Sequence, residues 1–153
     1  MKAFIYSMLT GVVVFTGLAR AQSVSAREKL IGAWRLVWME EQGADGKVTR
    51  ITDRKGMLVY TRDGHISVQL MFPKAESAAS SNPVQYAQGG YEASFGSYEV
   101  NEAAHTVTHR LEGSLVRSLV GKDLPRVFRF ADGHLILRSA RPDEHWSVTW
   151  EHY

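Results

Sequence analysis

Residues 31–40 read IGAWRLVWME and place two tryptophans four residues apart near the start of the regular part of the sequence. Alternate side chains of a β-strand point to opposite faces, so Trp34, Leu36 and Trp38 share one face and Arg35 marks the other. Burying a charge without a partner is costly. The stretch therefore predicts a first strand whose charged face meets solvent and whose tryptophan face enters a hydrophobic core.

The chain beyond this strand continues with a period of two, interrupted by turn signals. Asp-Gly recurs within residues 43–47, 62–65 and 131–134, and this dipeptide tolerates the positive φ angles of tight hairpins. Residues 101–105 supply a fourth turn. The predicted strands are 33–41, 46–52, 56–61, 65–72, 93–100, 105–112, 125–130, 134–139 and 145–151. Short strands joined by hairpins predict an all-β antiparallel domain, either an up-and-down barrel or a sandwich.

Two segments depart from this pattern. Residues 25–30 (SAREKL) offer a serine N-cap with a glutamate three positions later, which predicts a short helix before the first strand. Residues 73–94 lack strand alternation and are rich in Ala, Ser and Gln. They are predicted to form one long loop that either flanks a binding site or only connects two strands.

The N-terminus has the features of a secretory signal peptide. Lys2 precedes an apolar run over residues 3–19, and alanines flank Arg20 at the positions that a signal peptidase reads. We expect residues 1–21 to be removed, with a second possible site after Ala26. The domain would then span residues 22–153 and reside in the periplasm or outside the cell.

Removal of the signal changes the charge of the chain. Of 18 basic residues two, Lys2 and Arg20, lie in residues 1–21, which leaves 16 basic against 16 acidic residues. We therefore expect neither nucleic acid binding nor stable membrane insertion after cleavage. The sequence has no cysteine, so packing and not disulfides must hold the domain together. Closing a barrel would remove free sheet edges, so nothing requires dimerisation, and the oligomeric state stays open.

Alternation also places several polar side chains on apolar strand faces. Tyr98, His109 and Arg126 are predicted to point inward, with Tyr60 and Gln69 as further candidates. A mostly apolar interior with a few convergent polar groups is typical of a small-molecule cavity. The alternative is a filled core in which these groups satisfy one another.

Four longer motifs resemble the bacterial lipocalin-like domain proteins. They are LIGAWRLV (30–37), LVYTRDGHISVQLM (58–71), FGSYEVNEAAHTVTHRLEGSL (95–115) and FADGHLILRSA with VTWEHY (130–140 and 148–153). The resemblance covers nearly the whole domain and implies a single up-and-down barrel, a cup with an open mouth and Gly32-x-Trp34 at its base. The Thr-Asp-Tyr motif and the cysteines of other lipocalins are absent, so the transport and signalling roles of those proteins are not carried over.

Three hypotheses follow for function. The first is a barrel that binds a small hydrophobic ligand, with no cofactor and no metal. Its predicted ligand-binding residues are Trp38, Tyr60, Gln69, Tyr98, His109, Arg126 and Phe128. Trp38 belongs to this set because it lies about 13 Å beyond Trp34 on the same strand face, and Arg126 suggests an acidic group on the ligand.

The second hypothesis is an isomerase or cyclase that acts on a hydrophobic substrate inside the barrel. His109 and Tyr98 would serve as an acid–base pair, with Arg126 stabilising an enolate or carboxylate. The third is a non-catalytic envelope protein with a filled core.

Overall fold

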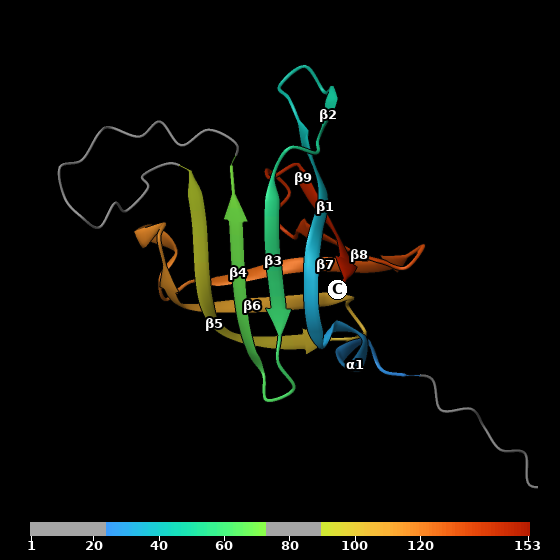
Figure 1. The fold of residues 1–153 in the computed structure, drawn as a ribbon, viewed down its shortest axis with the longest axis vertical. Coiled ribbons are helices and arrows are strands. Elements are labelled where there is room, and N and C mark those ends of the chain that lie inside the picture. Colours follow the sequence, from blue (N-terminus) through green and yellow to red (C-terminus); the bar gives the residue numbers. More distant parts are fainter. Residues whose placement is uncertain (1–23, 73–89) are drawn as a thin grey trace, which may run out of the picture.

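The computed structural model describes residues 24–72 and 90–153, which form nine strands and two short helices (Figure 1). The elements are α1 (Ala26–Leu30), β1 (Gly32–Gln42), β2 (Val48–Ile51), β3 (Lys55–Tyr60), β4 (His65–Met71), β5 (Tyr91–Asn101), β6 (Thr106–Ser114), the 3₁₀ helix η1 (Arg117–Leu119), β7 (Asp123–Ala131), β8 (His134–Ser139) and β9 (Trp146–His152). Each predicted strand is present, with its ends shifted by no more than two residues. The signal peptide predicted at 1–21 and residues 73–89 of the predicted loop lie outside the described residues.

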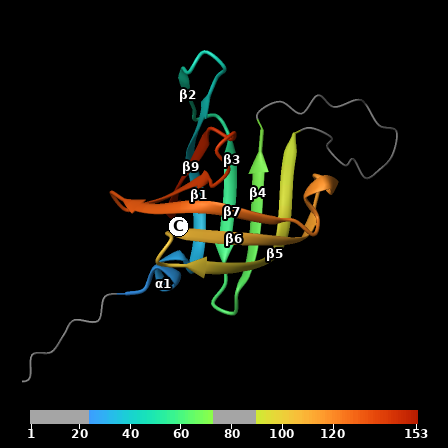
Figure 2. The same cartoon turned by 180° about the vertical axis from the view of Figure 1, so that it is seen from behind.

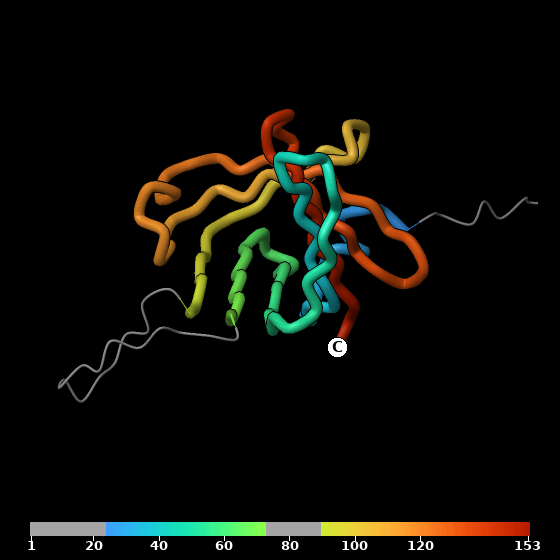
Figure 3. The backbone as a smooth tube through the Cα atoms, turned by 90° about the horizontal axis from the view of Figure 1, so that it is seen from above, coloured from blue at the N-terminus to red at the C-terminus, as the bar shows by residue number. Residues whose placement is uncertain are grey.

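Eight of the strands close into a single antiparallel barrel. They pair in the order β1-β3-β4-β5-β6-β7-β8-β9, and β9 pairs back with β1 from Trp34 to Glu41. Strand β2 pairs with the far end of β1 and makes a hairpin that projects above the barrel (Figure 2). The view from above shows the strands following one another around the barrel (Figure 3). The barrel prediction is therefore confirmed over the sandwich.

The closed end of the barrel is built from α1 and the Gly-x-Trp sequence. Ser25 caps α1 by accepting a hydrogen bond from the Glu28 backbone N–H at 3.1 Å, as its sequence predicts. Trp34 is 2% exposed and donates from Nε1 to the Leu30 carbonyl at 2.8 Å, which ties the helix to β1. Gly32 has a φ of 135°, and a Cβ there would collide with the His152 ring. That ring lies against Trp34, so the glycine makes room for the stack.

Strand β1 contains a β-bulge that reverses the orientation predicted for Trp38. In the pairing with β9, Leu36 lies opposite Trp150 and Trp38 lies opposite Thr149, so Val37 is an extra residue. A single inserted residue exchanges the two faces of the strand beyond it. Met39 and Glu41 consequently point inward, and the inward orientation predicted for Trp38 is wrong.

Strand β5 bends sharply partway along its length (Figure 1), and its residues 91–97 pair with β4 while its residues 94–101 pair with β6. A second bulge between β5 and β6 falls at the step from Phe95 to Gly96. A Cβ at Gly96 would overlap the backbone of Arg110, so only glycine permits this approach. The bend carries the sheet from one wall of the barrel to the other. Residues 91 and 92, predicted as loop, belong to this strand, as do residues 93 and 94, where the predicted loop and strand overlap.

Candidate functional site: an interior cavity

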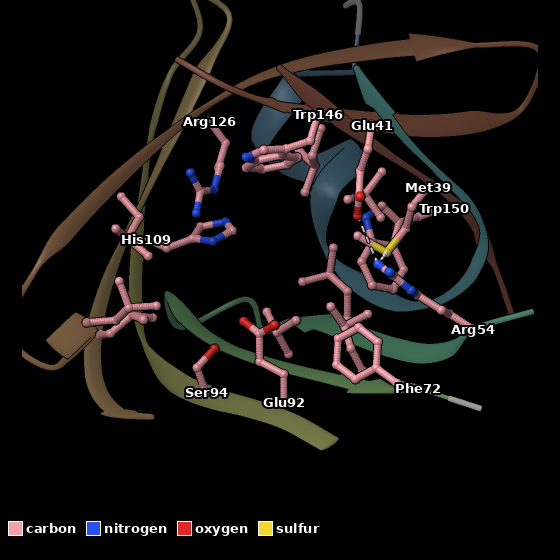
Figure 4. Close-up of a pocket in the computed structure, with 18 of the residues that line it drawn as sticks. Met39, Glu41, Arg54, Phe72, Glu92, Ser94, His109, Arg126, Trp146 and Trp150 are labelled. Atoms are coloured by element: carbon pink, nitrogen blue, oxygen red, sulfur yellow. Dashed lines mark hydrogen bonds and ion pairs between the residues drawn. The ribbon is translucent and has the colours of Figure 1, made fainter. Parts of the chain in front are cut away.

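The barrel interior holds a cavity of about 650 Å³ (Figure 4). Its rim lies at the barrel end opposite α1, where β1 and β4 finish and β3, β5 and β9 begin. Most of the wall is apolar and comes from Met39, Leu58, Val68, Leu70, Phe72, Leu111, Leu119, Leu124, Leu137, Trp146, Val148 and Trp150. Small-molecule sites typically measure about 300–1,000 Å³ and have walls of this kind. The described residues thus leave an open space where the filled-core alternative requires packed side chains.

His109, which lines the cavity from β6, is hydrogen-bonded to Tyr60 on β3. Tyr60 Oη and His109 Nε2 lie 2.7 Å apart, and the side chains are 1% and 6% exposed. Burial raises the pKa of Tyr60 well above its usual value, with Tyr98 adding to the effect and Arg126 opposing it. Burial, together with the nearby Arg126 charge, lowers the pKa of His109 to about 3. Both groups are therefore neutral at pH 7.

The second hypothesis assigned acid–base chemistry to His109 and Tyr98, and the structure pairs His109 with Tyr60 instead. An efficient general base or acid has a pKa near the working pH, and neither His109 nor Tyr60 meets that condition. Tyr98, the predicted partner of His109, instead donates its hydroxyl to the Thr61 carbonyl at 2.8 Å. The arrangement is suited to orienting a ligand by hydrogen bonds.

Arg126 on β7 supplies the positive charge in this part of the cavity. Its guanidinium lies over the Trp146 ring at 4.7 Å, and its nearest carboxylate, Glu144 Oε2, is 3.9 Å from Nη1. Burial lowers the pKa of Arg126, while Glu144 and, more weakly, Tyr60 and Glu92 oppose the shift. Figure 4 shows Arg126 and His109 on one side of the cavity and Glu92 and Ser94 on the other. The charge faces the cavity without a close ion pair among the described residues.

The rim has a second polar group that the sequence did not reveal. Arg54 Nη1 lies 3.1 Å from the Glu41 carboxylate and 3.4 Å from the sulfur of Met39. The guanidinium also lies 4.7 Å from the centre of the Phe72 ring. Glu41 and Met39 reach the interior only because of the β1 bulge, for which the sequence carries no local signal. The Glu41–Arg54 pair is thus a feature of the tertiary structure.

Glu92 and Ser94 on β5 were also missed, although a signal for them exists. They have the same parity as Tyr98, which alternation had already placed inside. Ser94 already lies in the predicted strand 93–100, and extending that strand back to residue 91 would also have found Glu92. The absence of clear strand composition over 73–94 concealed the start of β5.

The seven predicted ligand-binding residues fall into three groups. His109 and Arg126 line the cavity, and Tyr60 is hydrogen-bonded to His109. The alternation of side chains along the strands therefore predicted the inward direction of these three residues correctly. Tyr98 and Phe128 point inward but are packed in the closed end, Tyr98 edge-on to Tyr60 and Phe128 against Phe130. Their role in ligand binding stays a prediction.

Trp38 and Gln69, the remaining two, lie on the outer face of the barrel. The Trp38 ring stacks against the Arg50 guanidinium at 4.5 Å and contacts His134. Gln69 is exposed and accepts a hydrogen bond from the Tyr91 hydroxyl at 2.8 Å. The β1 bulge turns Trp38 outward, and regular alternation on β4 turns Gln69 away from the cavity-lining Val68 and Leu70. The prediction that these two side chains point into the cavity is therefore wrong.

Two features are absent from residues 24–72 and 90–153. They contain no group of three or more His, Asp or Glu side chains placed to hold a metal ion. No helix in this part of the chain is both long and apolar enough to cross a membrane.

A closed antiparallel barrel with a Gly-x-Trp base, one open end and an apolar interior defines a lipocalin-like protein. The family model described as lipocalin-like domain matches residues 31–152, so the chain belongs to that family. No curated protein matches the chain. Nine chains of solved structures match it. Among them is a lipocalin-like protein from Bacteroides uniformis, 15% identical, with 81% of this chain and 98% of that chain covered and a TM-score of 0.47.

Proposed function

We propose that this protein is an exported lipocalin-like barrel that binds a small, largely apolar molecule in its interior cavity. The observation that carries the proposal is the cavity of about 650 Å³, walled mainly by aliphatic and aromatic side chains and open at one end. Burial of apolar ligand surface stabilises a complex by roughly 25 cal/mol per Å². Apolar contact would supply most of the affinity, and the polar groups would fix the orientation.

Export is the second part of the proposal, and it is supported by the sequence of residues 1–21. Their basic start, apolar run and small residues beside Arg20 match what signal peptidase recognises. N-terminal sequencing of protein recovered from the periplasm or the medium should show a start after Ala21 or Ala26. Recovery of full-length chain in the cytoplasm alone would contradict export.

Ligand binding can be tested with purified protein and a cavity-filling variant. Native mass spectrometry should detect bound apolar molecules, and long-chain acids or alcohols should raise the melting temperature of the protein. Val68 lines the cavity from β4, so Val68→Phe should clash with a ligand. A clash of about 1–3 kcal/mol weakens binding by about 5- to 150-fold.

Val59→Phe is the matched control. Val59 lies on the neighbouring strand β3 and is not among the cavity-lining residues, so the same substitution there should leave affinity unchanged. If no apolar molecule binds the wild-type barrel, the proposal is wrong. Equal effects of the two substitutions would show that binding occurs outside the cavity.

A further inference from the structure

Resting on that proposed function, we infer that the cavity selects a ligand with one deprotonated acid group. The oxygens of that group would accept hydrogen bonds from the Arg126 guanidinium and from Nδ1–H of His109. In the sequence alone, only the charge of Arg126 suggests an acidic group on the ligand. The structure adds a second donor, the state of its proton, and the reason that the charge is available to a ligand.

The tautomer of His109 follows from its bond to Tyr60. The Tyr60 hydroxyl is buried and has His109 Nε2 as its partner at 2.7 Å. If Nε2–H were the donor, the hydroxyl proton of Tyr60 would be buried without an acceptor, which is costly. Tyr60 therefore donates to Nε2, and the neutral imidazole carries its proton on Nδ1.

Nδ1–H of His109 is available to a ligand. It makes no hydrogen bond with residues 24–72 or 90–153, and it is not among their buried, unpartnered side-chain atoms. The ring lines the cavity, so Nδ1 is accessible from inside. His109 thus contributes a hydrogen-bond donor, and Tyr60 acts as the residue that positions it.

The guanidinium of Arg126 is available because its nearest carboxylate is held elsewhere. Glu144 accepts hydrogen bonds from Arg141 at 2.9 Å and from Trp146 Nε1 at 3.2 Å, but lies 3.9 Å from Arg126, beyond hydrogen-bonding distance. The Arg126 side chain is 16% exposed, so its charge is largely desolvated without close compensation. A carboxylate ligand would supply two acceptor oxygens to a planar group that binds them in parallel.

The same geometry disfavours other polar groups on the ligand. An amine would place a second positive charge beside Arg126 and would bring only donors to Arg126 and His109, which are themselves donors. An alcohol would offer a neutral and weaker acceptor. Glu92 faces Arg126 from the opposite wall (Figure 4), so a second negative charge on the ligand would meet a carboxylate. A monoacid with an apolar body fits all three constraints.

The test compares probes that share one chain and differ in their polar end. Dodecanoate, dodecanol and dodecylamine are titrated at pH 7.5, below their micelle concentrations, with intrinsic tryptophan fluorescence as the readout. Two of the four tryptophans, Trp146 and Trp150, line the cavity. Wild-type protein should bind dodecanoate about 10- to 100-fold more tightly than dodecanol.

Arg126→Met should remove this preference by weakening dodecanoate binding about 10- to 100-fold and dodecanol binding less than about 3-fold. Arg129→Met is the matched control, because Arg129 lies on the same strand but is exposed on the opposite face. If Arg126→Met does not fold, Glu144→Gln serves as a second variant. It removes a competing negative charge and should tighten dodecanoate binding by about 2- to 5-fold without affecting dodecanol.

The role of Tyr60 has its own readout. Tyr60→Phe should mix the two neutral tautomers of His109, seen in its ¹⁵N chemical shifts, and weaken dodecanoate more than dodecanol. Equal affinity of wild-type protein for acid and alcohol would overturn the inference and leave the proposed function standing. Binding of none of the three probes would instead count against the proposed function itself.

Discussion

At the scale of single residues, burial has opposite consequences for His109 and Arg126. His109 responds to desolvation by staying neutral, with its pKa lowered to about 3. Arg126 remains charged, because the guanidinium pKa starts so high that burial cannot neutralise it at ordinary pH. The cavity therefore contains one neutral and one charged donor, and both depend on burial that the barrel provides.

The shift at His109 predicts a pH dependence of stability. The ordinary histidine pKa of 6.5 applies to the unfolded chain and about 3 to the folded one, so the unfolded chain binds more protons between these values. The free energy of unfolding should therefore fall as the pH is lowered through this window. Urea unfolding should show about 2 kcal/mol less stability at pH 5 than at pH 8 from this group.

A variant isolates the contribution of His109 from that of the carboxylates. His109→Gln should lose most of the decrease between pH 8 and pH 5, whereas His134→Gln, at the outer face beside Trp38, controls for removal of an imidazole. Arg126 and Tyr60, the groups that face His109, do not titrate in this range. Parallel curves for wild-type protein and His109→Gln would contradict the assignment.

At the scale of elements, the bulge in β1 determines which residues reach the cavity. Before Val37 the strand buries Trp34 and packs the partly buried Leu36 against the core, and after it the strand buries Met39 and turns Glu41 inward. The bulge also leaves Trp38 outside, where its ring stacks on Arg50. One extra residue thus divides β1 into two parts whose inward-facing residues follow different alternations, one part at the closed end of the barrel and the other at the rim.

Deletion of Val37 should therefore destabilise the barrel strongly. Without the extra residue, either Met39 leaves the core or the pairing with β9 slips. Loss of a buried methionine alone costs about 2–5 kcal/mol. Urea unfolding of the deletion variant measures the loss. Deleting Ala44, in the exposed β1–β2 turn, is the control and should cost much less; similar losses would show that the bulge is not required.

At the scale of the whole molecule, the pairing of β1 with β9 closes a curved sheet into a barrel that encloses a cavity. β9 contributes Trp146, Val148 and Trp150 to the cavity wall and closes the hydrogen-bonding of β1 and β8. Without it both neighbours would expose sheet edges, which promote aggregation. The closure of the barrel and the presence of the cavity therefore both depend on β9.

Truncation tests that dependence. A chain ending at residue 145 should fail to form a monomeric barrel, because it lacks the strand that pairs with both β1 and β8. Far-UV circular dichroism and size-exclusion chromatography would show lost β structure or aggregates. Removing only Tyr153, which is 69% exposed, should cost no more than about 1 kcal/mol. A folded, monomeric chain without β9 would contradict this account.

Local chemistry accounts for what the sequence predicted by itself. Turn residues and period-two alternation depend on a few neighbouring residues, so they located the strands, the buried Trp34 and the inward orientation of His109 and Arg126. The same rule failed at Trp38. The bulge is a property of the pairing between β1 and β9, and nothing within β1 announces it.

Only the tertiary structure could bring together residues far apart in the chain. Tyr60 and His109 are 49 positions apart, and their 2.7 Å contact requires β3 and β6 to face each other across a closed barrel. The tautomer of His109, the separation of Arg126 from Glu144 and the opposing position of Glu92 depend on that closure. The sequence determined a β-barrel with polar groups inside. The three-dimensional pairing decided which of them meet, because contact between distant strands depends on register and curvature, which no local pattern encodes.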